Sequence, residues 1–126
     1  MKSKRIEIRV KRVYDDPEES DGRRILVDRL WPRGLAKENA RVDIWVKEIA
    51  PSTELRRWYG HDPNKWTEFK SRYVTELETN TDQVEVILDE LKAGIVTFLY
   101  SSTEVRLNNA VALKEYLESI TNDKVV

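Results

Sequence analysis

Two short runs of apolar residues constrain the fold more than any other feature of this sequence. Ile25–Val27 and Ile95–Tyr100 are each bounded by charged, polar or glycine residues. Continuous apolar runs of this length are typical of strands that are buried on both faces, as in a parallel sheet covered by helices. We therefore expect both runs to lie in the middle of a sheet, with helices in the long segment between them.

A further strand is predicted by an alternating pattern near the amino terminus. Ile6, Ile8 and Val10 alternate with charged residues, which is typical of a strand with one solvent-facing side, near a sheet edge. The acidic segment Asp15–Gly22 is rich in breakers and predicts an exposed loop. The weak alternation of Val42–Val46 is compatible with a third strand or with a short helix.

Helix signals occupy the segment between the two apolar runs. Ser52 can cap a helix that Gly60 ends, and Asp62 followed by Pro63 begins a second helix. Asp82 is predicted to cap a third helix. The apolar faces predicted for the second and third helices consist of Trp66, Phe69, Tyr73, Leu77, Val84, Ile87, Leu88 and Leu91.

A last helix is predicted after the second apolar run. Ser101–Thr103 supplies a cap, with Glu104 three residues after Ser101, so we expect the helix to open there. Strands separated by helices predict a single three-layer α/β domain over residues 1–126, with a small, mostly parallel sheet and helices on both faces. The buried face of the last helix is predicted to contain Ala110, Leu113, Leu117 and Ile120.

Composition excludes several classes of protein. There is no Cys and only one His, so disulfides, thiolate metal sites and zinc-binding spacings are excluded, and we expect no metal and no cofactor. The amino terminus lacks the apolar region of a signal peptide, and no run approaches the roughly 20 apolar residues of a membrane span. We expect a cytoplasmic protein with no membrane partner. A net charge of −1 makes nucleic acid an unfavourable partner, and the oligomeric state is not predicted.

Candidate ligand-binding residues follow from the rule that open parallel sheets bind ligands beyond the carboxyl ends of their strands. Ser101 and Ser102 follow one strand, where a helix start would favour an anion. Arg29 and Arg33 flank Trp31 after another strand, and two guanidinium groups could clamp a phosphate or carboxylate beside this aromatic wall. The alternative is that Trp31 is a core residue and both arginines bind helix ends or carboxylates.

His61 is the first candidate for proton transfer, because it is the only side chain with an unperturbed pKa near neutrality. Asp28 or Asp62 could orient its ring, and we assign His61 and Asp28 as the catalytic candidates. Structural roles are open for His61 and Asp62 as well. His61 could cap the helix that ends at Gly60, and Asp62 is better explained as a helix cap than as a catalytic group.

Longer runs of residues are specific enough to compare with a known family. They are Lys11–Tyr14, Asp21-Gly22, Arg24–Leu35, Trp45, Glu48–Ser52, Glu54–Arg56, Trp58–Pro63, Trp66, Phe69 and Arg72-Tyr73. Over nearly its whole length the chain resembles the YeaO-like family, domain of unknown function 488. The resemblance implies a compact α/β fold and brings no particular reaction, substrate or cofactor.

The chain departs from this family at the start of the predicted last helix. The family pattern has an acidic residue and a His before an Asn, whereas this chain has Arg106 and Leu107 before Asn108. If that His takes part in chemistry, this member has lost the activity or works without it. We count Asn108 among the candidate ligand-binding residues.

Two main hypotheses follow. In the first, the protein binds or converts a small phosphate- or carboxylate-bearing ligand held between Arg29–Arg33, His61 and Ser101–Thr103, which requires these segments to line one cleft. In the second, it is a non-catalytic interaction module with exposed aromatic residues, such as Trp58 or Tyr59, and a structural His61. A nucleic-acid accessory role ranks third.

Overall fold

Four parallel strands and five α-helices make up residues 6–122, the part of the chain that this computed structural model describes. The strands are β1 (Ile8–Arg12), β2 (Arg23–Leu26), β3 (Ile44–Trp45) and β4 (Val96–Tyr100), and the helices are α1 (Lys37–Ala40), α2 (Thr53–Tyr59), α3 (Trp66–Glu78), α4 (Thr81–Ala93) and α5 (Asn109–Asn122). The strand order is β1-β4-β2-β3, and every pair is parallel. The expected domain also includes residues 1–5 and 123–126, which lie outside the described part.

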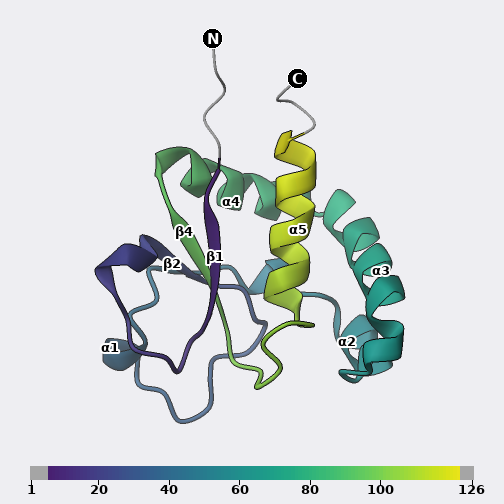
Figure 1. The fold of residues 1–126 in the computed structure, drawn as a ribbon, viewed down its shortest axis with the longest axis horizontal. Helices are drawn as coiled ribbons and strands as arrows, with labels where there is room; N and C mark the ends of the chain where they lie inside the picture. The colour runs from purple at the N-terminus through teal and green to yellow at the C-terminus, as the bar shows by residue number, and fades with distance from the viewer. Residues whose placement is uncertain (1–5, 123–126) are drawn as a thin grey trace.

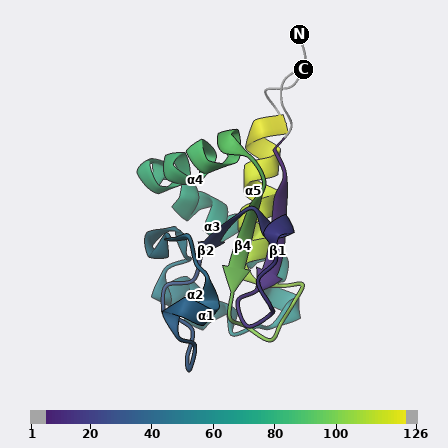
Figure 2. The same ribbon diagram turned by 90° about the vertical axis from the view of Figure 1, so that its left-hand side faces the viewer.

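The carboxyl ends of the three longer strands lie level with one another. Arg12 pairs with Tyr100 between β1 and β4, and Leu26 pairs with Leu99 between β2 and β4. The backbone N–H of Val27 extends the second pairing by donating to the carbonyl oxygen of Leu99 over 3.1 Å. The segments that follow these strands therefore leave the sheet close together. Figures 1 and 2 both show the loops after β1 and β4 at the lower end of the molecule.

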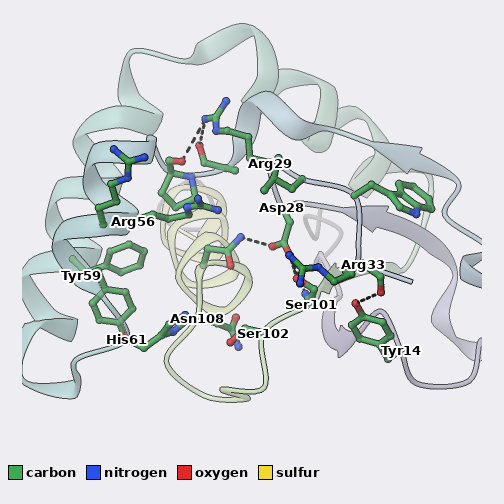
Figure 3. Close-up of a pocket in the computed structure, with 17 residues that line it drawn as sticks. Tyr14, Asp28, Arg29, Arg33, Arg56, Tyr59, His61, Ser101, Ser102 and Asn108 are labelled. Carbon is green, nitrogen blue, oxygen red and sulfur yellow. Dashed lines mark hydrogen bonds between the residues drawn. The ribbon is translucent and has the colours of Figure 1, made fainter. Parts of the chain in front are cut away.

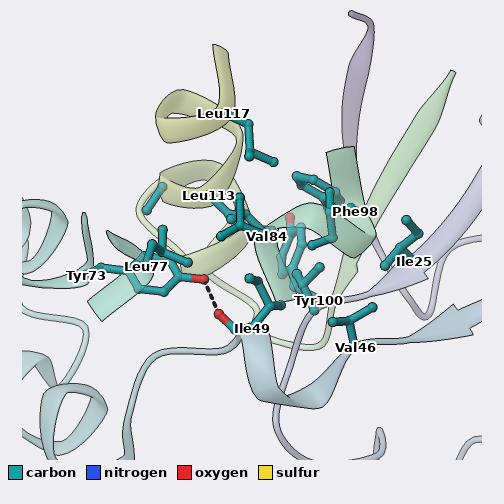
Figure 4. Packing of buried hydrophobic residues seen from close by; sticks show 14 of the residues in the cluster. Ile25, Val46, Ile49, Tyr73, Leu77, Val84, Phe98, Tyr100, Leu113 and Leu117 are labelled. Atoms are coloured by element: carbon teal, nitrogen blue, oxygen red, sulfur yellow. Dashed lines mark hydrogen bonds between the residues drawn. The ribbon is translucent and has the colours of Figure 1, made fainter. Parts of the chain in front are cut away.

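The two faces of the sheet are covered unequally. Figure 1 shows α3 and α5 on one side of the strands and α1 on the other. Successive β4 residues point to opposite faces, so Phe98 and Tyr100 join the main core under the long helices while Leu99 joins a smaller core under α1. In the main core, Tyr73 donates its hydroxyl to the carbonyl oxygen of Ile49 over 2.6 Å (Figure 4). The predicted α/β fold with helices on both faces is confirmed, with the four-residue α1 as the second helical layer.

The strand predictions are confirmed. Ile25–Val27 is completely buried, every residue of β4 is buried, and β1 lies at the edge of the sheet. The segment Val42–Val46, for which strand and helix were both open, contains the two-residue strand β3, which pairs with β2.

Most of the predicted helix boundaries around α2 and α3 are confirmed. Ser52 caps α2 by accepting a hydrogen bond from a backbone N–H, and Gly60 ends it in the left-handed conformation with φ of 53°. The Asp62 carboxylate accepts from the backbone N–H of Asn64 over 3.0 Å and begins a 3₁₀ turn that leads into α3. His61 lies at an exposed corner between the two helices, with φ of 56°.

Two predicted helix starts are wrong. α4 begins at Thr81, so Asp82 lies inside its first turn and is not the cap. α5 begins at Asn109, so Ser101–Thr103 lies in a loop and receives no helix dipole. Asn108 caps α5 instead, because its side-chain Oδ1 accepts from a backbone N–H three residues later over 3.0 Å.

The prediction of a wholly exposed acidic loop is wrong for Asp21. This residue is only 4% exposed, and its carboxylate lies 2.5 Å from Arg24 Nη1 and 3.2 Å from Lys11 Nζ. Two cations and a backbone N–H donor at Glu18 compensate for the loss of hydration, which is why a carboxylate tolerates this position. The spacing of residues in the loop carries no signal for such long-range partners.

The predicted apolar helix faces are mostly buried. Those that are buried are Phe69, Tyr73, Leu77, Val84, Ile87 and Leu91, whereas Trp66 and Leu88 are half-buried. None of the helices in residues 6–122 combines the length and the apolar character needed to cross a bilayer.

Candidate functional site

A pocket of about 560 Å³ opens where β1, β2 and β4 end. The loops after these strands, the α2 region and the start of α5 provide its lining (Figure 3). All eight residues that the sequence suggested for the site are in this lining: Asp28, Arg29, Trp31, Arg33, His61, Ser101, Ser102 and Asn108. Residues far apart in the sequence thus share one cavity, as the small-molecule hypothesis requires.

Asp28 lies in the middle of the pocket and is surrounded by donors. Its Oδ2 accepts from the backbone N–H and the hydroxyl of Ser101, each over 2.9 Å, and its Oδ1 accepts from Asn109 Nδ2 over 3.1 Å. The indole N–H of Trp45 donates to its backbone carbonyl over 2.8 Å. These contacts hold the loop after β4 and the start of α5 against the end of β2.

Arg29 uses most of its guanidinium donors within the protein. Its Nη2 donates to the carbonyl oxygens of Ala50 and Pro51 over 3.0 and 3.4 Å, and its Nη1 lies 3.5 Å from the carboxylate of Glu48. Its Nε is buried and has no hydrogen-bond partner within the described part of the protein. Arg29 therefore fastens the segment before α2 to the end of β2, which is the structural role left open by the sequence.

Three other arginines in the lining keep their charge available. Arg33, Arg56 and Arg57 are exposed, and none of them forms an ion pair with a carboxylate in the described part of the chain. Among residues 6–122, Asp28 is the only carboxylate in the pocket lining. Positive charge therefore exceeds negative charge in the pocket, and an anion would be stabilised there.

The loop after β4 supplies hydroxyl and amide groups in a fixed arrangement. The guanidinium of Arg12 donates to the carbonyl oxygens of Ser101 and Ser102 over 2.9 and 2.8 Å. The Ser102 hydroxyl accepts from the backbone N–H of Glu104, which leaves its own proton free to be donated. Asn108 is only 2% exposed, and its side-chain amide donates to the carbonyl oxygen of Glu104 while its oxygen caps α5.

His61 lies at the margin of this arrangement. It is exposed, its ring centroid is 5.9 Å from that of Tyr59, and it forms no ion pair with a carboxylate of residues 6–122. The two carboxylates expected to orient it have other partners, because Asp62 caps the following turn and Asp28 binds Ser101. His61 therefore lines the pocket without the orienting contact that a general base usually has.

Of the two aromatic residues suggested for the interaction-module hypothesis, Tyr59 is not exposed and Trp58 is exposed only in part. Tyr59 is only 4% exposed and donates its hydroxyl to the carbonyl oxygen of Leu107 over 2.7 Å. Burial raises the pKa of Tyr59, so its hydroxyl remains a donor at neutral pH. Trp58 is half-buried, with the guanidinium of Arg72 4.2 Å and the ammonium of Lys65 5.1 Å from its ring centroids.

The positions where the chain departs from the family pattern serve a turn. Neither Arg106 nor Leu107 lines the pocket, and their backbone N–H groups both donate to the carboxylate of Glu104. These two hydrogen bonds lower the pKa of Glu104, and the nearby charge of His61 acts in the same direction. At these two positions the backbone donors, and not the side chains, hold the carboxylate of Glu104.

Sequence reasoning missed four residues of the lining that carry polar groups, namely Tyr14, Arg56, Arg57 and Asn109. Tyr14 follows β1, so the strand-end rule could have found it. Arg56 and Arg57 are the basic residues of the last turn of α2, and only the placement of that helix against the sheet brings them to the pocket.

Comparisons with known proteins agree on one family. Residues 7–125 match the family model DUF488-N3i, described as the inactive DUF488-N3 subclade. The chain is 43% identical over 111 residues to the uncharacterized protein Rv3073c of Mycobacterium tuberculosis, an alignment that covers 87% of this chain and 92% of that protein. It is 42% identical over 113 residues to the uncharacterized protein YeaO of Escherichia coli, covering 90% and 98%. No solved structure matches the chain. The chain therefore belongs to the YeaO-like DUF488 family, within the group that the matching model describes as inactive.

Proposed function

We propose that this protein binds a small ligand bearing phosphate or carboxylate groups in the pocket at the carboxyl ends of β1, β2 and β4, without converting it chemically. The observation that carries the proposal is the meeting of Arg33, Arg56 and Arg57 at one pocket in which Asp28 is the single carboxylate of the described residues. Guanidinium groups bind phosphate and carboxylate oxygens in a planar, two-bond geometry.

Two further hydrogen-bond donors of the pocket support the same ligand class. The Ser102 hydroxyl has a free proton, and the buried Nε of Arg29 is a donor without an acceptor in residues 6–122. Both can donate to oxygen atoms of an anion or of a bridging water. The volume of about 560 Å³ lies within the range of roughly 300 to 1,000 Å³ that is usual for small-molecule sites.

Binding without conversion is favoured by the state of the two catalytic candidates. Asp28 accepts three hydrogen bonds, and His61 forms no ion pair with a carboxylate of the described residues. A general base must be positioned toward the proton that it removes, and neither group is held in that way. The description of the matching family as an inactive subclade agrees with a binding role.

The test is titration calorimetry with inorganic phosphate and with malonate, a small dicarboxylate. We expect phosphate to bind the wild-type protein and to lose roughly tenfold or more in affinity when Arg33, Arg56 and Arg57 are all changed to Gln, because charge-assisted hydrogen bonds are lost. A matched control changes Lys37, Arg41 and Lys92 to Gln, since these exposed cations lie outside the pocket lining. Equal loss in both variants, or no binding of phosphate or malonate to the wild type, would contradict the proposal.

An interaction surface is the second candidate, and exposed aliphatic residues favour it. Leu30 is 67% exposed at the pocket, and Val105 is 56% exposed in the loop after β4. Large exposed apolar side chains around a basic site are common at interfaces. Light scattering of the wild type and of Leu30→Ser would test self-association through this surface, and a monomer in both cases would argue against it.

A further inference from the structure

We infer that the ligand of this pocket carries two anionic groups, one bound at Arg33 and the other at Arg56 and Arg57. The inference rests on the proposed function and narrows the ligand to compounds that contain a diphosphate or a longer polyphosphate group. Three observations carry it: the positions of the free arginines, the charge between them and the size of the cavity.

The free arginines come from two different walls of the pocket. Arg33 belongs to the loop after β2, and its backbone carbonyl is held by the Tyr14 hydroxyl over 2.8 Å. Arg56 and Arg57 belong to α2, which Ser52 caps. Figure 3 shows Arg56 and Arg33 on opposite sides of the pocket. The available positive charge is therefore divided between two places.

The middle of the pocket disfavours a single central anion. Asp28 and Asn108 lie between the two walls (Figure 3), and Asp28 carries the only negative charge that the described residues bring to the lining. A carboxylate repels a phosphate placed next to it, and the repulsion falls with distance. Two anionic groups that are each bound by guanidinium groups have a cation beside them, while the connecting part of the ligand passes the hydroxyl and amide groups of the floor.

The size of the cavity agrees with an extended ligand. Its volume of about 560 Å³ falls in the range that accommodates drug-sized molecules, far more than one phosphate fills. Phosphate groups match the two-bond geometry of guanidinium groups, so condensed phosphates present suitable oxygens at both ends.

The test compares orthophosphate, pyrophosphate and tripolyphosphate by calorimetry on the wild type, on Arg33→Gln and on the double variant Arg56→Gln/Arg57→Gln. We expect at least one condensed phosphate to bind the wild type roughly tenfold more tightly than orthophosphate. The condensed phosphate should bind both the Arg33 variant and the double variant more weakly than it binds the wild type. Orthophosphate, which can contact only one wall, should lose affinity in one of them. Arg41→Gln serves as the control, because Arg41 is exposed and lies outside the pocket lining.

The outcomes separate this inference from the proposed function. If orthophosphate binds and neither condensed phosphate binds more tightly, or if all three depend on the same wall, the two-group inference is overturned while the proposed function stands. If none of the phosphates binds, the proposed function fails for phosphate and the inference fails with it. Melting temperatures without ligand should agree among the variants, because the three arginines have no ion-pair partners to lose among residues 6–122.

Discussion

Asp28 organises the pocket because its carboxylate collects donors from two other segments. Ser101 and Asn109 are held to the end of β2 through this side chain and the neighbouring backbone. Through these hydrogen bonds, the Asp28 carboxylate orders the loop after β4, and its charge repels anions from the centre of the pocket. As a catalytic base, the role that the sequence suggested, Asp28 would have one acceptor position left on Oδ1, because three hydrogen bonds occupy the other positions.

At the same scale, Gly22 is required by a close backbone contact. A Cβ atom at this residue would lie 2.3 Å from the carbonyl oxygen of Ile95, and φ is +65°. We predict that Gly22→Ala destabilises the protein by roughly 2–5 kcal/mol, because overpacking adds to the cost of a left-handed alanine. Urea denaturation of the purified variant measures this.

Gly34 provides the matched control for that prediction. Its φ is +73°, but no atom of the described residues lies within 4 Å of an added Cβ. Gly34→Ala should therefore cost only about 1–2 kcal/mol, the conformational part. Similar losses for the two variants would show that the contact with Ile95 is unimportant.

Among the elements, α2 has the largest effect on the site because it carries two of the free arginines. Its amino end is joined to α3 through Ser52, whose backbone N–H and hydroxyl donate to the carboxylate of Glu76 over 2.8 and 2.6 Å. The same hydroxyl oxygen accepts from Leu55 N–H over 3.1 Å. One serine thus sets both the start of the helix and its position against its neighbour.

Helix caps give a prediction that contrasts two residues with similar sequence signals. Ser52→Ala should cost about 1–2 kcal/mol, because it removes a cap and a contact with Glu76. Asp82→Ala should cost only about 0.5 kcal/mol, because Asp82 lies within the first turn of α4 and interacts with the helix dipole alone. Chemical denaturation of both variants tests the difference. Equal costs would mean that Asp82 acts as a cap after all.

Local patterns predicted most elements, and tertiary contacts decided the exceptions. The buried strands, the α2 cap and the turn at Gly60 depend on neighbouring residues, so the sequence contains their signals. Ser101 followed by Glu104 has the spacing of a helix start, but Ser101 binds Asp28, far away in the chain, and the helix begins at Asn109. Residue spacing carries no information about that partner.

The whole molecule explains how much of the site could be predicted. The strand-end rule brought Asp28, Arg33 and Ser101 to one place because parallel strands in register end together. Arg56 and Arg57 could not be found in this way, since the position of α2 over the sheet results from packing of the main core. Whether an arginine is bonded to carbonyl and carboxylate groups or is left without an ion pair likewise depends on residues distant in the sequence.

The face of the sheet opposite the main core depends on a buried ion cluster. Asp21 joins Lys11 of β1 and Arg24 of β2, and its carbonyl oxygen accepts from the Thr97 hydroxyl of β4 over 2.7 Å. A loop that reads as solvent-exposed is thereby fastened to three strands. Because the apolar core on this face is small, polar contacts provide much of the attachment between this loop and the sheet.

Acid stability should depend on this cluster. Burial alone would raise the pKa of Asp21, but hydrogen bonds from the backbone N–H of Glu18 and from the side chains of Arg24 and Lys11 together hold it below its ordinary value of 3.8. The folded state therefore favours the charged form of Asp21. The contribution of this charged carboxylate to the free energy of unfolding is complete above pH 3.8 and is lost as the pH falls through the lower, folded pKa.

Asp21→Asn should cost about 3–5 kcal/mol near neutral pH, because Arg24 loses its buried partner. In urea denaturation the gap to the wild type should narrow at acidic pH, whereas Glu19→Gln, at an exposed position of the same loop, should differ little at any pH. A gap of constant size throughout the acid range would show that the charge of Asp21 does not stabilise the fold.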